Sequence, residues 1–367
     1  MKINILLPGI CRVPTGGAKV MLEYANRLAA DGMDVTLFYP IEPKVNTVNN
    51  LSLKRKIRMY RKVFTKKLKQ KYSARIWFPL RKEIKERLVP YLGEQYMPDA
   101  DFTFATAWET AEWAVQYKEE KGEKLYLIQG YEDWSGTREE VDNTWKMPLK
   151  KIVIANWLKK HADALGQEAV LINNGLDFNR FHITQPIEHR QPFSVLMSYH
   201  TLTIKGSKDG IAALEIVKKE IPELTVTLFS IYKKPESIPD WIRFDHNPVY
   251  LKELYNNSAI FISPSLSEGW ALPPAEAMQC GCAVVVTDIG GHGDYGINGR
   301  DLLLTPSGDI KAMADQIIQL IKNNDRRIAI AKAGNTIIQQ FTWEAAYTKL
   351  KQEMDIKQKQ KEILLVQ

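Results

Sequence analysis

The sequence SPSLSEGWALPPAEAMQCGC, residues 263–282, lies between two short apolar runs. Residues 259–262 (AIFI) and 283–288 (AVVVTD) each have the length and composition of a buried strand. Between them, the prolines at 273–274 predict the first turn of a helix, and Gly281 predicts its end. The pattern therefore predicts strand, loop, helix and strand, which is one unit of a parallel α/β sheet.

Two acidic residues fall where such a sheet binds ligands. Glu268 lies on the predicted loop at the carboxyl end of the first strand, and Glu276 lies about one turn into the helix. The helix N-terminus favours a phosphate, and Gly269 lets a ligand approach the backbone closely. A carboxylate one turn into the helix can then reach the ribose of a bound nucleotide. The alternative is that both acids are solvated at the surface.

The spacing of Glu268 and Glu276, with Gly269 after the first, resembles the paired-glutamate motif of the GT4-like family, the retaining nucleotide-sugar glycosyltransferases of the GT-B fold. The resemblance implies an α/β fold of two Rossmann-like domains whose parallel sheets face each other across a cleft. It implies that Glu268 is catalytic and contacts the transferred sugar, whereas Glu276 holds the ribose. The backbone that would face the sugar and the diphosphate belongs to Gly269, Trp270, Ala271 and Leu272. The family usually has Phe-Gly where this chain has Trp-Ala, which affects the shape of the sugar pocket.

The length of 367 residues predicts two domains. The polar, proline-containing segment 182–192 predicts the linker, so the acceptor-side domain covers residues 1–182 and the donor-binding domain covers 193–340. The sequence NNGLDFNRF at 173–181 resembles the segment that closes the first domain in the family. The family resemblance also implies that the last helix, within 341–367, returns toward the first domain.

Composition excludes several classes of protein. The chain is 45% hydrophobic and 25% charged, as in soluble globular proteins, and its three cysteines make no disulfide framework. Cys280 and Cys282 are too close for a C-x-x-C redox or zinc site, and buried free thiols are expected. Residues 1–8 predict a strand rather than a signal peptide, and no apolar run is long enough to span a bilayer. We therefore expect a cytoplasmic protein.

The chain begins as a Rossmann-like unit, with a strand at 2–7, a glycine loop, a helix at 18–29 and a strand at 34–38. It lacks the G-x-G-x-x-G fingerprint and an acid after the second strand, which disfavours an NAD oxidoreductase. The family resemblance implies that the turn at Gly16 and Gly17 faces the donor diphosphate. A turn that needs a positive φ is the alternative.

The segment 51–88 is strongly basic, with 15 Lys and Arg and two acids between Lys54 and Arg87. Its apolar residues recur at helical spacing and form a stripe that consists of Leu53, Ile57, Tyr60, Phe64, Leu68 and Tyr72. An apolar stripe beside a cationic face is typical of a helix on an anionic membrane surface, where each basic residue contributes about 1 kcal/mol. The alternative is a stripe packed on the core, with solvated lysines. No nucleic-acid motif accompanies the charge, so we expect no nucleic-acid partner.

Two more predicted strands, at 100–107 and 124–128, end in polar residues, and sites collect at strand ends. The acceptor-side candidates are Trp108, Gln129, Tyr131 and Glu132. Many members of the family have a histidine near the position of Gln129, which this chain lacks. Its Gln-x-x-Glu arrangement resembles some bacterial polysaccharide glycosyltransferases.

After the predicted strand at 193–199, Lys205-Gly206 lies in a strand-to-helix loop, where a lysine is a good phosphate ligand. The family pattern here is Gly-Arg-Leu-x-x-x-Lys-Gly, which implies that Lys205 is a catalytic cation that holds the diphosphate. His200 occupies the arginine position. A neutral histidine lacks the bidentate, charge-assisted contact of arginine.

These features predict a hexosyltransferase-type enzyme that moves a sugar from a nucleoside diphosphate sugar to a hydroxyl of a glycan or lipid-linked acceptor. By resemblance, the reaction retains the anomeric configuration and serves cell-surface polysaccharide or glycoconjugate synthesis. We expect no cofactor and no metal, because no Asp-x-Asp motif or His/Cys cluster is present. A hydrolase or epimerase of the same fold, and a non-catalytic membrane-associated binding protein, are the alternatives.

Overall fold

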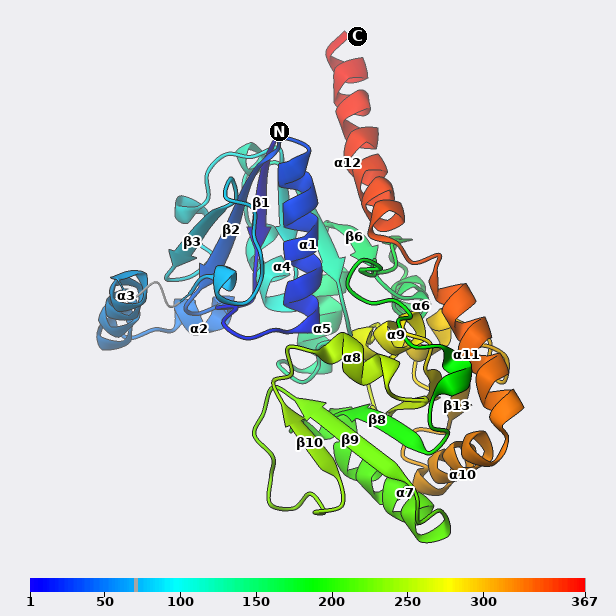
Figure 1. The fold of residues 1–367 in the computed structure, drawn as a ribbon. Helices are drawn as coiled ribbons and strands as arrows, with labels where there is room; N and C mark the ends of the chain where they lie inside the picture. The colour runs from blue at the N-terminus through cyan, green and yellow to red at the C-terminus, as the bar shows by residue number, and fades with distance from the viewer. Residues whose placement is uncertain (69–71, 367) are drawn as a thin grey trace. The chain divides into compact units, whose positions relative to one another are not determined.

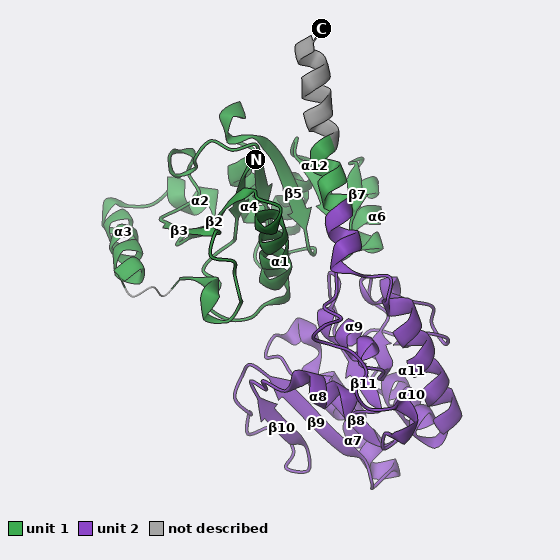
Figure 2. Cartoon of the chain, turned by 45° about the horizontal axis from the view of Figure 1, so that its top comes forward, with its two compact units in different colours: residues 1–173, 349–367 green, residues 174–348 purple. Residues whose placement is uncertain are grey.

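The computed structural model describes residues 1–68 and 72–366, with side chains through residue 355. These residues form two compact units, 1–173 with 349–367 and 174–348 (Figure 2). Each unit is a parallel β-sheet flanked by helices, so the predicted α/β fold of two Rossmann-like sheets is confirmed. Parts of the predicted basic segment (69–71) and of the last predicted helix (side chains from 356) lie outside the described residues.

The sheet of unit 1 has the strand order β3-β2-β1-β4-β5-β6-β7, with all neighbours parallel (Figure 1). The strands are β1 (Lys2–Leu6), β2 (Asp34–Pro40), β3 (Lys85–Val89), β4 (Phe102–Ala105), β5 (Glu123–Ile128), β6 (Lys150–Val153) and β7 (Ala169–Leu171). The helices are α1 (Gly16–Ala30), α2 (Val45–Asn49), α3 (Leu53–Leu68), α4 (Trp108–Ala114), α5 (Arg138–Trp145) and α6 (Asn156–Ala164). The order reverses between β1 and β4, where such a sheet opens a crevice for ligands.

The sheet of unit 2 has the order β10-β9-β8-β11-β12-β13, also all parallel. Its strands are β8 (Ser194–Ser198), β9 (Thr225–Ser230), β10 (Arg243–His246), β11 (Ile260–Ser263), β12 (Ala283–Thr287) and β13 (Leu303–Thr305). Its helices are α7 (Ser207–Glu220), α8 (Leu251–Asn256), α9 (Leu272–Gln279), α10 (Ile310–Lys322) and α11 (Asn324–Ile338), followed by α12 (Trp343–Val366). Here the order reverses between β8 and β11.

The segment 259–288 has the predicted strand–loop–helix–strand order. β11 and β12 are parallel neighbours, and α9 between them begins with Pro273 and Pro274 in its first turn. The helix stops where predicted, because Gly281 adopts a φ of +82° that side chains other than glycine rarely take. Cys280 and Cys282 are free and buried, as expected.

Residues 174–192 pack with unit 2, although we predicted that they end the first domain and form the linker. Ile187 is buried in the hydrophobic core of unit 2. The buried guanidinium of Arg190 donates to the carbonyl oxygen of Ser258 at 3.0 Å. This polar, proline-containing segment is therefore not a linker, because side-chain hydrogen bonds hold it against unit 2. The division between the two units falls between residues 173 and 174.

Helix α12 contributes to both units, since its residues from 349 onward group with unit 1. Lys150 of β6 pairs with Glu353 at 2.7 Å, and Lys351 pairs with Asp31 at 3.0 Å. No helix among the described residues combines the length and hydropathy needed to cross a membrane.

The basic segment 51–88 contains α3, which lies at the β3 edge of the unit 1 sheet (Figures 1 and 2). The alternative that its apolar stripe packs on the core is wrong for the residues on α3. Met59 and Val63 pack inward, whereas the stripe is exposed, with exposed fractions of 47–74% for Leu53, Ile57, Tyr60, Phe64 and Leu68. Tyr72 lies beyond α3 and packs edge-on against Tyr39, with the ring centroids 6.0 Å apart.

Candidate active site in unit 2

The loops that follow β8 and β11 meet at the point where the sheet order reverses. The backbone N–H of Leu266 donates to the carbonyl oxygen of Ile204 at 2.8 Å, which joins the two loops. Gly206 has a φ of +61°, and a Cβ there would overlap the carbonyl oxygen of Pro264. Glycine is therefore required at 206 both for its backbone conformation and for the close approach of the loops.

Lys205 and Glu268, both predicted as catalytic, are in direct contact. The Nζ of Lys205 lies 2.8 Å from each carboxylate oxygen of Glu268, and the hydroxyl of Ser265 donates to Oε1 at 2.9 Å. The Glu268 side chain is 14% exposed and that of Lys205 is 30% exposed. The pair places a cation and an acid together at the ligand-binding edge of the sheet.

Glu276 lies on α9 and is largely buried. Its Oε2 accepts a hydrogen bond of 3.2 Å from the hydroxyl of Tyr255, which is on α8. Burial, and then the negative charge of Glu276, raise the pKa of Tyr255 well above its usual value, so the phenol stays protonated and donates. The carboxylate is thereby held in one orientation.

The start of α9 offers few backbone donors, because neither Pro273 nor Pro274 has an N–H. Ala271 is the N-cap, and its carbonyl oxygen accepts a hydrogen bond from the hydroxyl of Tyr295. Gly291 lies against this loop so closely that a Cβ would overlap the carbonyl oxygen of Gly269. The donors left at this helix end are the N–H groups that precede the prolines.

Trp270 directs its side chain into the core of unit 2. It is 4% exposed and packs edge-on against Tyr295 at 4.8 Å and Phe341 at 5.4 Å between ring centroids. The backbone from Gly269 to Leu272 is therefore the part of this loop that a ligand at the sheet edge can use. Trp270, which replaces the family's Phe, therefore affects this loop by packing in the core and not by direct contact with a ligand.

His200, which stands at the family's arginine position, is uncharged at neutral pH. Burial lowers its pKa, and the positive charge of Lys205 lowers it further. Nδ1 accepts from the backbone N–H of Leu202 at 3.0 Å, so Nε2 carries the proton and faces the hydroxyl of Tyr232 at 3.3 Å. Lys205 is thus the source of positive side-chain charge in this loop.

In unit 1, Gly16 and Gly17 form the first turn of α1, and neither has a positive φ, so the alternative of a positive-φ turn is wrong. Gln129, at the end of β5, donates from its amide to the carbonyl oxygen of Gly17 at 3.1 Å. A Cβ on Gly17 would meet this amide at 3.5 Å. The predicted diphosphate turn and one acceptor-side candidate therefore lie side by side.

The other acceptor-side candidates are occupied with local contacts. The backbone N–H of Trp108 donates to Glu132 at 2.9 Å, which caps the start of α4, and the buried Trp108 indole donates to Ser135 at 2.8 Å. Tyr131 donates to Asp142 of α5 at 3.0 Å. Burial raises the pKa of Glu132 to about 8.

Sequence reasoning missed three supporting residues. Ser265 lies three residues before Glu268, and this short separation could have predicted the hydrogen bond between the two side chains. Tyr255 lies 21 residues before Glu276, and Lys44 reaches over the Trp108 ring at 5.1 Å from a different loop. The Tyr255–Glu276 and Lys44–Trp108 contacts join residues that are far apart in the sequence, so no sequence pattern predicts them. Among the described residues, no group of three or more His, Cys, Asp or Glu is placed to hold a metal.

Part of unit 2 is similar to a known protein family. Residues 240–336 match the model of the family Glycosyl transferases group 1. The matched region includes Glu268 and Glu276. A D-inositol 3-phosphate glycosyltransferase of Corynebacterium urealyticum is 33% identical to this chain over 26% of this chain's length and 23% of its own.

The capsular polysaccharide biosynthesis glycosyltransferase CapM of Staphylococcus aureus is 24% identical over 47% of this chain and 51% of CapM. The chain thus spans between about a quarter and a half of these curated relatives. Among solved structures, Anabaena HepE in complex with UDP-glucose superposes with a TM-score of 0.73 at 15% identity, covering 97% of this chain and 99% of HepE. The fold is therefore GT-B, and the predicted fold class is confirmed.

Proposed function

We propose that the protein is a glycosyltransferase that moves a sugar from a nucleoside diphosphate sugar to a hydroxyl of a glycan or lipid-linked acceptor. The observation that carries this proposal is the Lys205–Glu268 pair at the strand-order reversal of unit 2, with Glu276 held by Tyr255 one turn into α9. Lys205 would turn from Glu268 to the diphosphate, where negative charge develops as the sugar–phosphate bond breaks. Glu268, released from the pair, would accept hydrogen bonds from sugar hydroxyls.

The reaction class follows from the same groups. Two carboxylates at a loop and at a helix end suit donor binding, and the family resemblance implies retention of configuration. Among relatives, CapM is named for capsular polysaccharide biosynthesis, and an Escherichia coli relative is an O-antigen chain mannosyltransferase. These names support a role in cell-surface polysaccharide synthesis. Neither a metal nor a cofactor is part of the proposal.

Nucleotide binding is the first test. Thermal shifts with UDP, GDP, dTDP and ADP should rise selectively with one of them, and UDP is the first candidate because HepE binds UDP-glucose. Glu276→Ala should abolish the shift, whereas the control Glu215→Ala, an exposed acid on α7, should keep it. No shift with any nucleotide would contradict the donor site. Product analysis by NMR then separates sugar transfer with retention from hydrolysis or epimerisation.

We propose also that α3 binds the inner face of an anionic membrane. Its exposed apolar stripe is accompanied by eight Lys and Arg residues and no acid. Apolar insertion and attraction to anionic lipid would act together, with about 1 kcal/mol for each basic residue near the surface. An enzyme bound to the membrane would encounter a lipid-linked acceptor by diffusion within the plane of the membrane.

Sedimentation with vesicles tests this surface. The protein should pellet with vesicles that contain phosphatidylglycerol and less with phosphatidylcholine alone, and salt should weaken binding. The double variant Leu53→Ser/Phe64→Ser should lose binding. Ile76→Ser, which changes a residue with 59% exposure outside α3, is the matched control. Equal pelleting of the double variant and the control would overturn the membrane proposal.

A further inference from the structure

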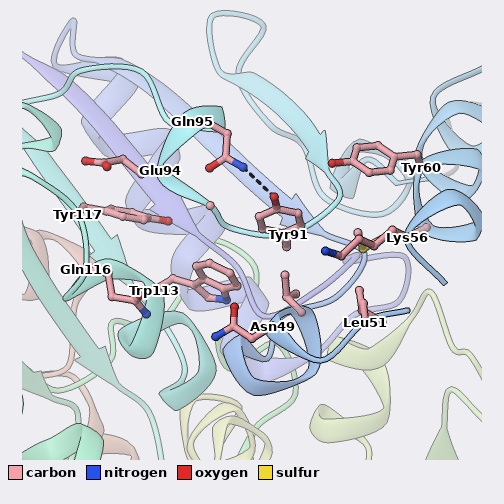
Figure 3. A pocket seen from close by; sticks show the side chains of 13 residues that line it. Asn49, Leu51, Lys56, Tyr60, Tyr91, Glu94, Gln95, Trp113, Gln116 and Tyr117 are labelled. Carbon is pink, nitrogen blue, oxygen red and sulfur yellow. Dashed lines mark hydrogen bonds between the residues drawn. The ribbon is translucent and has the colours of Figure 1, made fainter. Parts of the chain in front are cut away.

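Unit 1 contains a cavity of about 500 Å³ that the proposed chemistry does not use. It lies between α2, α3, the segment that follows β3 and the end of α4 (Figure 3). Its volume falls within the roughly 300–1,000 Å³ typical of small-molecule sites. The side chains that line it and matter most are Tyr60, Tyr91, Trp113, Asn49, Gln95 and Gln116.

One wall of the cavity is an aromatic platform. The rings of Tyr91 and Trp113 are stacked, with centroids 5.5 Å apart and planes 26° apart. The Trp113 indole N–H donates to the carbonyl oxygen of Pro43, and Tyr96 packs edge-on against Tyr91 at 5.3 Å. Trp113 is buried and covers one face of Tyr91, so the apolar surface that the platform leaves to the cavity belongs mainly to the half-buried Tyr91.

The rim of the cavity carries amides. Asn49, Gln95 and Gln116 are exposed, and Gln95 donates to the Tyr91 hydroxyl at 2.8 Å (Figure 3). Each amide has both a donor and an acceptor group, which together match a pair of adjacent hydroxyls. The charged residues of the lining, Lys56 and Glu94, have opposite signs, so the site has no net charge to select an ionic ligand.

A sugar ring has this same division, with an apolar C–H face and a rim of hydroxyls. We propose that the cavity binds a neutral saccharide, with one sugar face against Tyr91, which Trp113 supports from behind, and with its hydroxyls on the amides. Gly93 supports the assignment, because a Cβ there would lie 2.5 Å from the Tyr91 ring and 2.6 Å from the Gln95 amide oxygen. Only glycine leaves these two side chains in their positions at the cavity.

The cavity is connected to the acceptor-side candidates by two helices. Helix α4 runs from Trp108, which contacts Glu132, to Trp113 in the platform, and five residues of helix cover about 7.5 Å. Helix α2 begins after Lys44, which lies over the Trp108 ring, and ends at Asn49. We infer that the saccharide is a part of the acceptor glycan that lies beyond the sugar unit whose hydroxyl reacts. This assignment rests on the proposed transferase function.

Direct binding tests the site without any donor. Neutral maltose and cellobiose oligosaccharides and mannan fragments are titrated against the full chain by saturation-transfer NMR and tryptophan fluorescence. We expect binding by at least one series, weakened about five- to tenfold by Tyr91→Ala or Asn49→Ala, because each removes a stacking surface or a hydrogen-bonding group. Asn50→Ala, an exposed neighbour outside the lining, is the matched control and should bind as the parent does.

The outcomes separate this site from the donor site. Saccharide binding that the lining variants weaken and 0.5 M salt leaves unchanged supports the proposal. Binding that salt abolishes, or that Asn50→Ala weakens equally, overturns the neutral saccharide. If no series binds while the nucleotide shift and its loss in Glu276→Ala persist, the cavity proposal fails and the transferase proposal stands. Saccharide binding without any nucleotide shift supports the cavity and contradicts the donor site.

Discussion

The carboxyl edges of the two sheets hold their polar side chains in different ways. In unit 2, Lys205 and Glu268 satisfy each other, so both are within reach of a ligand that can exchange for the partner. In unit 1, Glu132 caps α4 and Tyr131 is tied to Asp142, so their polar groups are committed to the fold. A polar side chain at a strand end therefore indicates a ligand site only when a ligand can replace the group that it contacts in the free protein.

The largest effect should come from the exchangeable pair of unit 2. Lys205→Ala removes the cation expected on the diphosphate, so kcat should fall about 10²- to 10³-fold, as for loss of one stabilising donor at a reacting centre. Single-turnover kinetics with the identified donor sugar measure this. Lys208→Ala, an exposed lysine on the same loop-to-helix segment, should keep the parent rate. A small loss in Lys205→Ala would mean that this pair is structural, as in unit 1.

The docking of the two loops in unit 2 gives the next effect. Gly206→Ala should lower the free energy of unfolding by about 2 kcal/mol or more, since it combines a left-handed backbone with overlap on Pro264. Urea denaturation measures the loss. Gly293→Ala is the control, because a Cβ there meets nothing within 4 Å and φ is not positive. Equal stability of both variants would show that the loops are not packed as described.

In unit 1, the stability of the fold should depend on pH because of the buried carboxyl group of Glu132. Because the pKa of Glu132 is raised to about 8, its protonated form is favoured in the folded state, and its contribution to stability is complete below about pH 4.5. That contribution is lost as pH rises from about 4.5 to about 8. Glu132→Gln should flatten this decline in a series of thermal melts, whereas the exposed Glu139→Gln should keep it. An unchanged decline in Glu132→Gln would contradict the assignment.

The smallest effect should come from the residue that orients Glu276. Tyr255→Phe removes one hydrogen bond of 3.2 Å, so the affinity for the nucleoside diphosphate should fall about fivefold, the equivalent of about 1 kcal/mol. Isothermal titration calorimetry measures the affinity. Pyrophosphate, which has no ribose, should bind the parent and the variant equally if Glu276 holds the ribose. An equal loss for both ligands would mean that Tyr255 acts on the whole loop.

Predictability from sequence differed between central and edge strands. The central strands β1, β4, β8, β11 and β12 are buried on both faces, and each was recognisable as an apolar run. The strands missed were β3 (KERLV), β10 (RFDH) and β13 (LLT), and each is the outermost strand of its sheet. In β3 and β10 the edge position tolerates charged residues, so these sequences lack the apolar signal, whereas β13 is apolar but only three residues long.

The sequence alone determined the parallel α/β architecture and the positions of Lys205, Glu268 and Glu276, because local periodicity, proline, glycine and acid spacing act within one strand–loop–helix unit. Only the tertiary structure decided which groups are partners: Lys205 with Glu268, Tyr255 with Glu276, and Tyr91 with Trp113. It also decided that the α3 stripe is exposed. Helical periodicity shows that a face is apolar, but packing against the rest of the chain decides whether that face is buried or left to solvent.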